Sequence, residues 1–422
     1  MSFSSPARSL SPSSVSPPTV AVVAPGGDSA SAARYTGPEW ASIAVSLSPE
    51  ALPPAHRART AATGHREEIR HDTLRRTACE LRARQVGAIV PGSGPGVGLA
   101  EQLAHMLGIA GNLATTSVLR TDRAVQAAAL RDSGLAAPRG LHTGSLTAAL
   151  RWAELRDLPA YALAAADSAV TAPPAVCTST AEIRSAWPRL RAAALHESGS
   201  ADLVIQEVVP GQQFVAHTVS VPGSGQRAVV ALWSELRTGQ GVHGRSDLVD
   251  THSVLGRALL RYAGRALDVL GVRAGAARCR IAFSAEHGPT LLSAQAFART
   301  TPVEELVARA TGIDHVRATV QAVATGRLAP STRAYRHVSR VSLVAPRDGF
   351  LDGRLLGVLD SLPTVVATEG ALTPGARVRR TVDRATCPGV LVLAAASREA
   401  IERDYRAIRA LERLGLYGDA DR

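Results

Sequence analysis

A few groups of residues in the sequence have the types and spacing that binding and catalysis use. Gly239 to Gly244 follow the Gly-x-Gly-x-x-Gly spacing of dinucleotide sites, which need a strand before the glycines and a helix after them. The next residues, Arg245 to Leu248, do not open a long helix, so we expect a loop over a cleft. Four glycines between Gly92 and Gly98 precede a helical pattern, an arrangement that can hold an anion at the first turn of a helix.

Histidines and acidic pairs give weaker indications. His217 and His243 have side chains suited to general-base chemistry, although a structural histidine is the more frequent case. Asp247 and Asp250 would offer oxygen ligands to a cation, but two carboxylates leave most of a coordination shell unfilled. The chain has no Gly-x-Ser-x-Gly sequence and no lysine with which to build a Walker motif.

The basic residues are all arginine. There are 47 of them against 36 acidic residues, which gives a net charge of +11. They are spread along the chain, the densest run being Arg377 to Arg380, and aromatic residues make up only 4%. Nucleic acids bind to clustered positive charge and to stacking surfaces, so the composition argues against nucleic-acid binding. The bias toward arginine, alanine, glycine and proline is typical of a GC-rich bacterial genome.

Cysteine spacing and the N-terminus indicate the compartment. The four cysteines, at positions 79, 177, 279 and 387, lie too far apart for the paired spacing of a zinc site. Residues 1–18 are rich in serine and proline and lack the apolar stretch of a secretory signal, so we expect a disordered leader. No segment is long and apolar enough for a membrane span. We therefore expect a cytoplasmic protein that makes no membrane contact.

Alternating strand and helix patterns define the first unit, residues 19–113. Apolar runs at 20–24, 41–47 and 86–90 predict buried strands, and helical spacing predicts helices beginning near Leu74 and Leu99. The Pro- and charge-rich residues between these, at 50–70, predict a connection. Strands that alternate with helices indicate an α/β domain with a parallel sheet.

The rest of the chain mixes helices with antiparallel strand patterns. In residues 114–327, helices are expected at 122–133, near 146–153 and at 253–270, with β-like runs between them, which predicts an α+β unit. Residues 328–422 show three strand patterns and a closing amphipathic helix around Ile401 to Leu411. The fold class that we predict is therefore mixed, α/β followed by α+β.

Six strings of residues, in order along the chain, carry a resemblance to a known family. They are PGSGPGVGLAEQLAHMLGIAGN at 91–112, Arg120 to Arg123, Ala166 to Ala169, Ile205 to Gly211, Gly288 to Leu292, and a C-terminal set with Pro374-Gly375, Thr381 to Asp383 and Pro388-Gly389. These strings resemble the ATP-grasp carboxylate–amine ligases, in particular the L-amino-acid ligase branch. The resemblance implies an ATP-grasp architecture: an N-terminal parallel α/β domain, a central two-part nucleotide-binding unit and a small C-terminal α+β module.

The resemblance also implies an ATP site. Its residues would be Arg123, Asp167 and Ser168 at the phosphates, Gln206, Glu207 and Val209 at the adenine, and Gln213 on the ribose side. In the family two lysines neutralise the phosphates, and the matching positions here hold Arg123 and Ala164. Prolines at 173 and 174 follow the phosphate loop and have no N–H to offer. ATP is expected by resemblance, at a degenerate site.

The matching metal positions lack carboxylates. The family's two glutamates and asparagine correspond to Arg280, Ser293 and Gln295, and an arginine is hostile to a cation, so Mg²⁺ is not expected. The substrate-carboxylate arginine corresponds to Phe297, with Arg299 two residues further on the same strand face. Arg280 and Arg299 are the candidate catalytic cations. With Arg123 they would form a cluster that binds phosphate or carboxylate without a metal.

Two functions are compatible with these residues. The first is a pseudoligase, a binding or scaffold module in a biosynthetic pathway. Its partner would be an active ligase, another pathway protein or a second copy of the chain in a homodimer. The second is an active ATP-dependent ligase that forms an amide through an acyl phosphate and recruits Mg²⁺ through Glu207, Glu235 or Asp247. The two differ in whether at least two carboxylates converge where the phosphates would lie.

Overall fold

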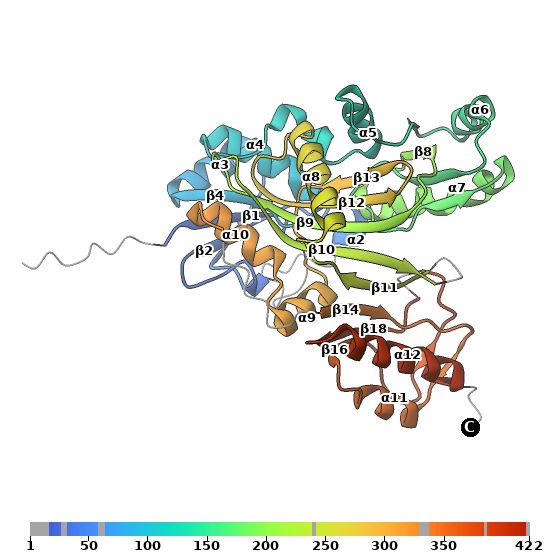
Figure 1. Cartoon of the computed structure of the whole chain (residues 1–422). Helices are drawn as coiled ribbons and strands as arrows, with labels where there is room; N and C mark the ends of the chain where they lie inside the picture. Colours follow the sequence, from blue (N-terminus) through green and yellow to red (C-terminus); the bar gives the residue numbers. More distant parts are fainter. Residues whose placement is uncertain are drawn as a thin grey trace, which may run out of the picture.

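The computed structural model describes residues 17–26, 32–57, 64–238, 242–328, 337–383 and 386–418. Within these residues, four sheets and the helices that cover them form the architecture shown in Figure 1. Most of the predicted leader, residues 1–16, lies outside the described residues. No helix of the described part is both long and apolar enough to cross a bilayer.

The N-terminal domain is a parallel sheet of order β3-β2-β1-β4, as predicted. Its strands are β1 (Thr19–Val23), β2 (Ala41–Ser46), β3 (Glu67–Arg70) and β4 (Val86–Pro91), and its helices α2 (Pro54–Arg57), α3 (Leu74–Ala83) and α4 (Val97–Leu107). The prediction of a mere connection at 50–70 is wrong, because β3 lies there. Only Ile69 of that edge strand is buried, so no apolar run marks it.

A small antiparallel sheet of order β5-β8-β6-β7 forms one half of the central unit. It contains β5 (Gly140–Thr143), β6 (Tyr161–Ala165), β7 (Ala175–Cys177) and β8 (Leu203–Glu207). Helices α6 (Leu146–Arg156) and α7 (Thr180–Ser198) pack on it around buried Leu163, Ile183 and Leu203. The segment between this sheet and β4 holds η1 (Gly94–Gly96), η2 (Ala114–Arg120) and helix α5 (Arg123–Asp132).

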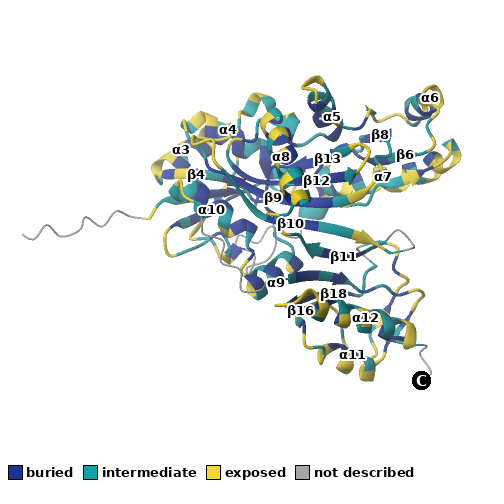
Figure 2. Ribbon diagram, viewed as in Figure 1, coloured by how far each residue is buried: buried dark blue, intermediate teal, exposed yellow. Residues whose placement is uncertain are grey.

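The large sheet has eight strands in the order β13-β12-β9-β10-β11-β14-β18-β16. Five belong to the central unit: β9 (Gln212–Ser220), β10 (Arg227–Arg237), β11 (His243–Leu248), β12 (Gly275–Ser284) and β13 (Gly288–Gln295). Helix α8 (Val254–Val269) covers β12 and β13 with its apolar side, and α9 (Pro302–Thr311) and α10 (His315–Thr325) follow. Figure 2 shows β9 in this sheet as largely buried, whereas β10 becomes exposed at its end.

The C-terminal residues complete the large sheet rather than starting a separate one. Strands β14 (His337–Ser342), β16 (Val365–Gly370) and β18 (Gly389–Ala395) join it through antiparallel pairs. The closing amphipathic helix is α12 (Arg398–Leu414), which packs with α11 (Gly353–Asp360) over these strands. A small sheet of β15 (Gly349–Leu351), β17 (Arg377–Val378) and β19 (Tyr417–Gly418) closes this end.

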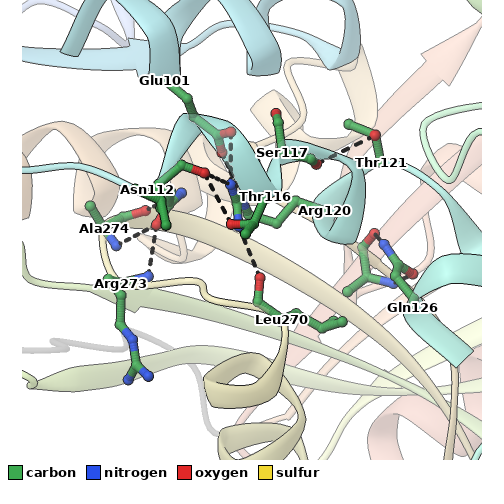
Figure 3. Close-up of polar contacts among 12 residues, drawn as sticks. Glu101, Asn112, Thr116, Ser117, Arg120, Thr121, Gln126, Leu270, Arg273 and Ala274 are labelled. Carbon is green, nitrogen blue, oxygen red and sulfur yellow. Dashed lines mark hydrogen bonds and ion pairs between the residues drawn. The ribbon is translucent and has the colours of Figure 1, made fainter. Parts of the chain in front are cut away.

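A buried arginine fastens the N-terminal domain to the central unit (Figure 3). Arg120 forms a two-pronged ion pair with Glu101 of α4, at 2.6 and 2.9 Å, and both side chains are buried. The same guanidinium donates to the carbonyl oxygen of Leu270, at the end of α8, at 3.0 Å. Asn112 adds a second connection, because its Oδ1 accepts the backbone N–H groups of Arg273 and Ala274. These contacts join the N-terminal domain to the central unit, which carries the candidate site.

Candidate functional site

Strand β12 carries two arginines on one face of the large sheet. Arg278 and Arg280 alternate with Cys279 and Ile281, which lie in the apolar core under α8. This alternation is the period of two expected for a strand with one polar face. Across the ladder, Gln295 of β13 pairs with Arg278 and Ser293 pairs with Arg280.

These residues line a cavity of about 310 Å³ above the sheet. Its other walls come from the loop after β6, from β10, β11 and β14, and from C-terminal residues 369–370, 382–383, 387 and 389–390. Its described lining includes six arginines, at positions 123, 237, 278, 280, 299 and 340, and four carboxylates, at positions 235, 304, 369 and 383. Among these described residues, arginines therefore outnumber carboxylates by two.

Arg280 reaches across strand β9 to β10. Its Nη2 atom donates to Gln213 Oε1 at 2.9 Å and lies 3.4 Å from Glu235 Oε2. Burial alone would raise the pKa of Glu235, but Arg280 and Arg278 outweigh it and lower this pKa to about 2. Glu235 is therefore an ionised partner of arginines.

Glu304 is held in the same way at the start of α9. Arg340 of β14 donates to it at 3.0 Å and stacks over the ring of buried Trp233, 4.2 Å from the ring centroid. Burial would raise the pKa of Glu304, and the charges of Arg340 and Arg278 instead lower it to about 2. Glu235 and Glu304, both partly buried, are thus neutralised by arginine.

The charge of Arg278 is only weakly compensated. It lies 3.9 Å from Glu235, and its side chain donates no hydrogen bond within the described residues. Burial and the nearby charge of Arg299 lower its pKa to about 9, which still leaves the guanidinium charged at neutral pH. A buried, under-bonded cation is costly unless an anion pairs with it.

In the loop after β6, four consecutive backbone N–H groups are already hydrogen-bonded within the protein. The N–H groups of Ser168, Ala169, Val170 and Thr171 donate to Thr121 O, Asp167 Oδ1, Asp167 O and Glu197 Oε2. The next wall residues, at positions 173 and 174, are prolines without an N–H. A phosphate cradle needs several free amides aimed at one point, and this stretch does not supply them.

The carbonyl oxygens of this loop instead face the arginines. Arg123 Nη2 donates to the carbonyls of Ser168 and Val170, at 3.4 and 3.3 Å, and Arg299 lies 3.5 Å from that of Ala169. Gln295 also bonds the carbonyl of Ser168 and accepts from Arg299 at 3.2 Å. Ala169 packs against Phe297, at the turn that begins with Gly94. These contacts join the sheet β5-β8-β6-β7 to the eight-stranded sheet.

Six residues that the sequence analysis assigned to a nucleotide, metal or substrate site converge on the cavity: Arg123, Ser168, Arg280, Ser293, Gln295 and Arg299. Glu235 and His243, the candidate metal ligand and base, line it as well. Gln213 contacts it through Arg280, and Asp167 caps the loop, where burial raises its pKa. The predicted adenine residues Gln206, Glu207 and Val209 do not line it. Glu207 accepts the backbone N–H of Arg139 at 2.9 Å.

The other residues that the sequence analysis singled out contact neighbouring protein groups. Of the predicted loop 239–244, residues 239–241 lie outside the described residues, and His243 and Gly244 belong to β11, so the loop prediction is wrong for these two. His243 lies in the cavity lining, 2.9 Å from Ser246 Oγ. Asp247 pairs with Arg245 at 2.6 Å, and Asp250 accepts the N–H of His252.

The charged cavity residues that escaped the sequence analysis include Arg278, Arg340 and Glu304, as well as Arg237 and Glu369. The alternation Arg278-Cys279-Arg280-Ile281 could have identified the first, because it places two arginines on one strand face. Arg340 and Glu304 come from a distant strand and helix, and only the register β10-β11-β14 brings them to the site.

The donors at this site suit magnesium poorly. The positions that the resemblance assigns to the metal hold a guanidinium, a hydroxyl and an amide, at Arg280, Ser293 and Gln295. Among the described residues no group of three histidine, cysteine or acidic side chains is arranged to hold a metal ion. The two buried glutamates of the cavity are paired with arginines.

Known structures share this architecture. L-amino acid ligase from Bacillus licheniformis has a TM-score of 0.66 at 14% identity, over 93% of this chain and 97% of that one. An ADP complex of N5-carboxyaminoimidazole ribonucleotide synthetase also has a TM-score of 0.66, at 13% identity, over 94% and 98%. The biotin carboxylase domain dimer of Hydrogenobacter thermophilus 2-oxoglutarate carboxylase, with MgADP, ADP and bicarbonate, has a TM-score of 0.59 at 15% identity, over 91% and 88%.

The chain therefore has the fold of ATP-grasp ligases along almost its whole length, as the sequence predicts. No protein-family model and no curated protein matches its sequence.

Proposed function

We propose that this protein is a pseudoligase: it has the ATP-grasp fold, binds an anionic ligand in its arginine-lined cavity, and does not carry out magnesium-dependent ligation. In this proposal the cavity is a recognition site. The protein acts as a binding or scaffold module in a biosynthetic pathway, beside an active ligase or another pathway protein, and a homodimer is compatible with that role.

The contact of Arg280 with Glu235 is the observation that carries this proposal. By resemblance, the Arg280 position is that of a metal-binding glutamate, and a guanidinium there pairs with the carboxylate of Glu235. A cation at this point would have to displace Arg280 and compete with its positive charge. The site thus supports binding of anions better than binding of Mg²⁺.

The backbone of the phosphate loop supports the same conclusion. Its four bonded amides and two prolines leave the arginines as the donors available to an anion. Guanidinium groups can bind phosphate or carboxylate bidentately and need no metal to do so. ATP, which the resemblance implies, would be bound here through its triphosphate.

A calorimetric titration with ATP, in EDTA and then in excess MgCl₂, tests the proposal. We expect binding in EDTA that Mg²⁺ leaves unchanged or weakens, because the metal would neutralise the phosphates that the arginines recognise. An Arg123→Ala variant should bind more weakly.

Binding that Mg²⁺ strengthens would contradict the pseudoligase and favour the active ligase, which screening amino acids for phosphate release would then examine. Absence of binding in both conditions would leave only the scaffold role.

A further inference from the structure

The cavity holds four guanidinium groups, those of Arg278 with Arg299 and of Arg123 with Arg280. Arg278 and Arg280 are two residues apart on β12, which separates their Cα atoms by about 6.6 Å on one strand face. Arg299 donates to Gln295 at 3.2 Å, and Gln295 is the cross-strand partner of Arg278. Arg123 lines the same cavity from the start of α5. Four positive charges therefore gather over the large sheet.

Several donors in these pairs have no protein acceptor. The Nε–H groups of Arg123, Arg278 and Arg280 are buried and donate no hydrogen bond among the described residues. Arg123 as a whole is only 7% exposed. Buried donors normally have partners, so these unpaired N–H groups leave part of the arginine charge uncompensated within the protein. Because the Nε atoms have no accessible surface, a ligand in the cavity would bind to the terminal Nη groups.

The balance of charged side chains in the cavity also indicates an anionic ligand. Among the described lining residues, six arginines exceed four carboxylates by two, and Glu235 and Glu304 are already paired. A ligand with two negative charges would neutralise this surplus. A singly charged ligand would leave one pair of guanidinium groups unscreened.

The adenine end of the fold takes no part in this cavity. Gln206, Glu207 and Val209 do not line it, and the Glu207 side chain is bonded to the backbone of Arg139. Binding energy would therefore come from charged groups and not from a base.

We propose that the ligand of this site is a small molecule with two anionic groups, carboxylate or phosphate, separated by about the spacing of Arg278 and Arg280, and recognised without adenine. One group would lie between Arg278 and Arg299 and the other between Arg123 and Arg280. This inference rests on the proposed function, since it specifies the anion that the pseudoligase binds.

Calorimetry of the full chain with inorganic and organic probes tests the inference. Tripolyphosphate, pyrophosphate and orthophosphate form one series, malonate, succinate and acetate a second, and ATP and adenosine complete the set. We expect a probe with two anionic groups to bind at least about tenfold more tightly than orthophosphate or acetate, which each offer one group. Tripolyphosphate should bind about as tightly as ATP, and adenosine should not bind. The better of the two series distinguishes phosphate from carboxylate.

Paired variants assign the binding to the cavity. Arg278→Gln should lose at least about tenfold in affinity for the best probe, whereas Arg261→Gln, on the exposed side of α8, should lose none. Arg278 is suited to this test because its side chain donates no hydrogen bond in the described structure, so its loss should leave folding intact. Unchanged affinity in Arg278→Gln would overturn the inference.

The outcomes separate this inference from the function on which it rests. ATP that binds about tenfold more tightly than tripolyphosphate, or adenosine that binds alone, would leave an anion-binding pseudoligase but refute the inference. If acetate or orthophosphate binds as tightly as the probes with two anionic groups, the inference is refuted as well. No binding by any probe, ATP included, would remove the proposed anion site itself.

Discussion

Arg280 and Glu235 face each other across an intervening strand, with Nη2 of the arginine 3.4 Å from Oε2 of the glutamate. Gln213, on the strand between them, accepts from the same nitrogen atom. The pair links β12 to β10 and places a positive charge at the position that the resemblance gives to a metal-binding carboxylate. The chemistry that we expect of the cavity depends on this pair.

Removal of the Glu235 carboxylate should destabilise the free protein and strengthen anion binding. Glu235→Gln leaves Arg278 and Arg280 without their counter-charge, at a cost of roughly 1–3 kcal/mol, discounted because all three side chains keep some exposure to solvent. Urea unfolding with and without tripolyphosphate measures both effects. The anion should restore most of the lost stability.

Glu286→Gln, an exposed residue in the β12–β13 turn, is the matched control and should change neither quantity. A Glu235→Gln variant as stable as the parent would contradict the role that we assign to this carboxylate.

Arg120 should be among the most sensitive positions for stability. Arg120→Ala leaves Glu101 buried without a partner and removes the bond to Leu270, so we expect a loss of about 3–5 kcal/mol in the free energy of unfolding (Figure 3). Arg76→Ala removes an exposed pair with Asp72 and should cost less than about 1 kcal/mol. Equal losses in the two variants would show that the domains are not fastened through Arg120.

Acidification should destabilise the protein through two stacked histidines. His217 and His315 lie with ring centroids 4.9 Å apart and planes inclined by 12°, and burial lowers the pKa of both, with His315 adding to the effect on His217. Below their ordinary pKa of about 6.5 the unfolded chain binds more protons than the folded one. The free energy of unfolding should therefore be highest above pH 6.5 and fall below it.

The slope below pH 6.5 should be up to about 1.4 kcal/mol per pH unit for each histidine that stays neutral. Urea unfolding at several pH values between 7 and 5 measures it. A His217→Gln, His315→Gln double variant should show a shallower slope. The part of the slope that remains would come from groups such as His65, whose pKa burial lowers to about 4. An unchanged slope in the double variant would refute this assignment.

Cys387 offers a chemical probe of the cavity charge. It lies in the cavity lining and is half-buried, whereas Cys79 is exposed on α3 and Cys177 and Cys279 are buried. The surplus of arginines should attract anionic iodoacetate over neutral iodoacetamide, so the ratio of the two alkylation rates should be several-fold higher at Cys387 than at Cys79. Mass spectrometry of tryptic peptides measures it. Equal ratios at the two thiols would indicate that the cavity is not cationic. The same would follow if bound tripolyphosphate did not slow the alkylation of Cys387.

Much of the architecture could be predicted from the sequence because long elements leave periodic patterns. The buried run of β1 and the apolar stripe of α8 are examples. Helix α7 was not predicted, since Pro188 interrupts its pattern, and the edge strand β3 buries only Ile69. Arg123, Arg280 and Arg299 were predicted as a cluster and line one cavity. The pairing of Arg280 with Glu235 could not be predicted, because it depends on the order in which β12, β9 and β10 assemble.

A ligand-bound crystal structure with manganese tests the central claim most directly. Crystals grown with tripolyphosphate and MnCl₂, measured at the manganese edge, report separately on the anion and on the metal. We predict density for the anion against Arg278 and Arg280, with no anomalous peak between Arg280, Ser293 and Gln295. An anomalous peak at that point, with Arg280 displaced from Glu235, would contradict the pseudoligase and restore a metal-dependent ligase.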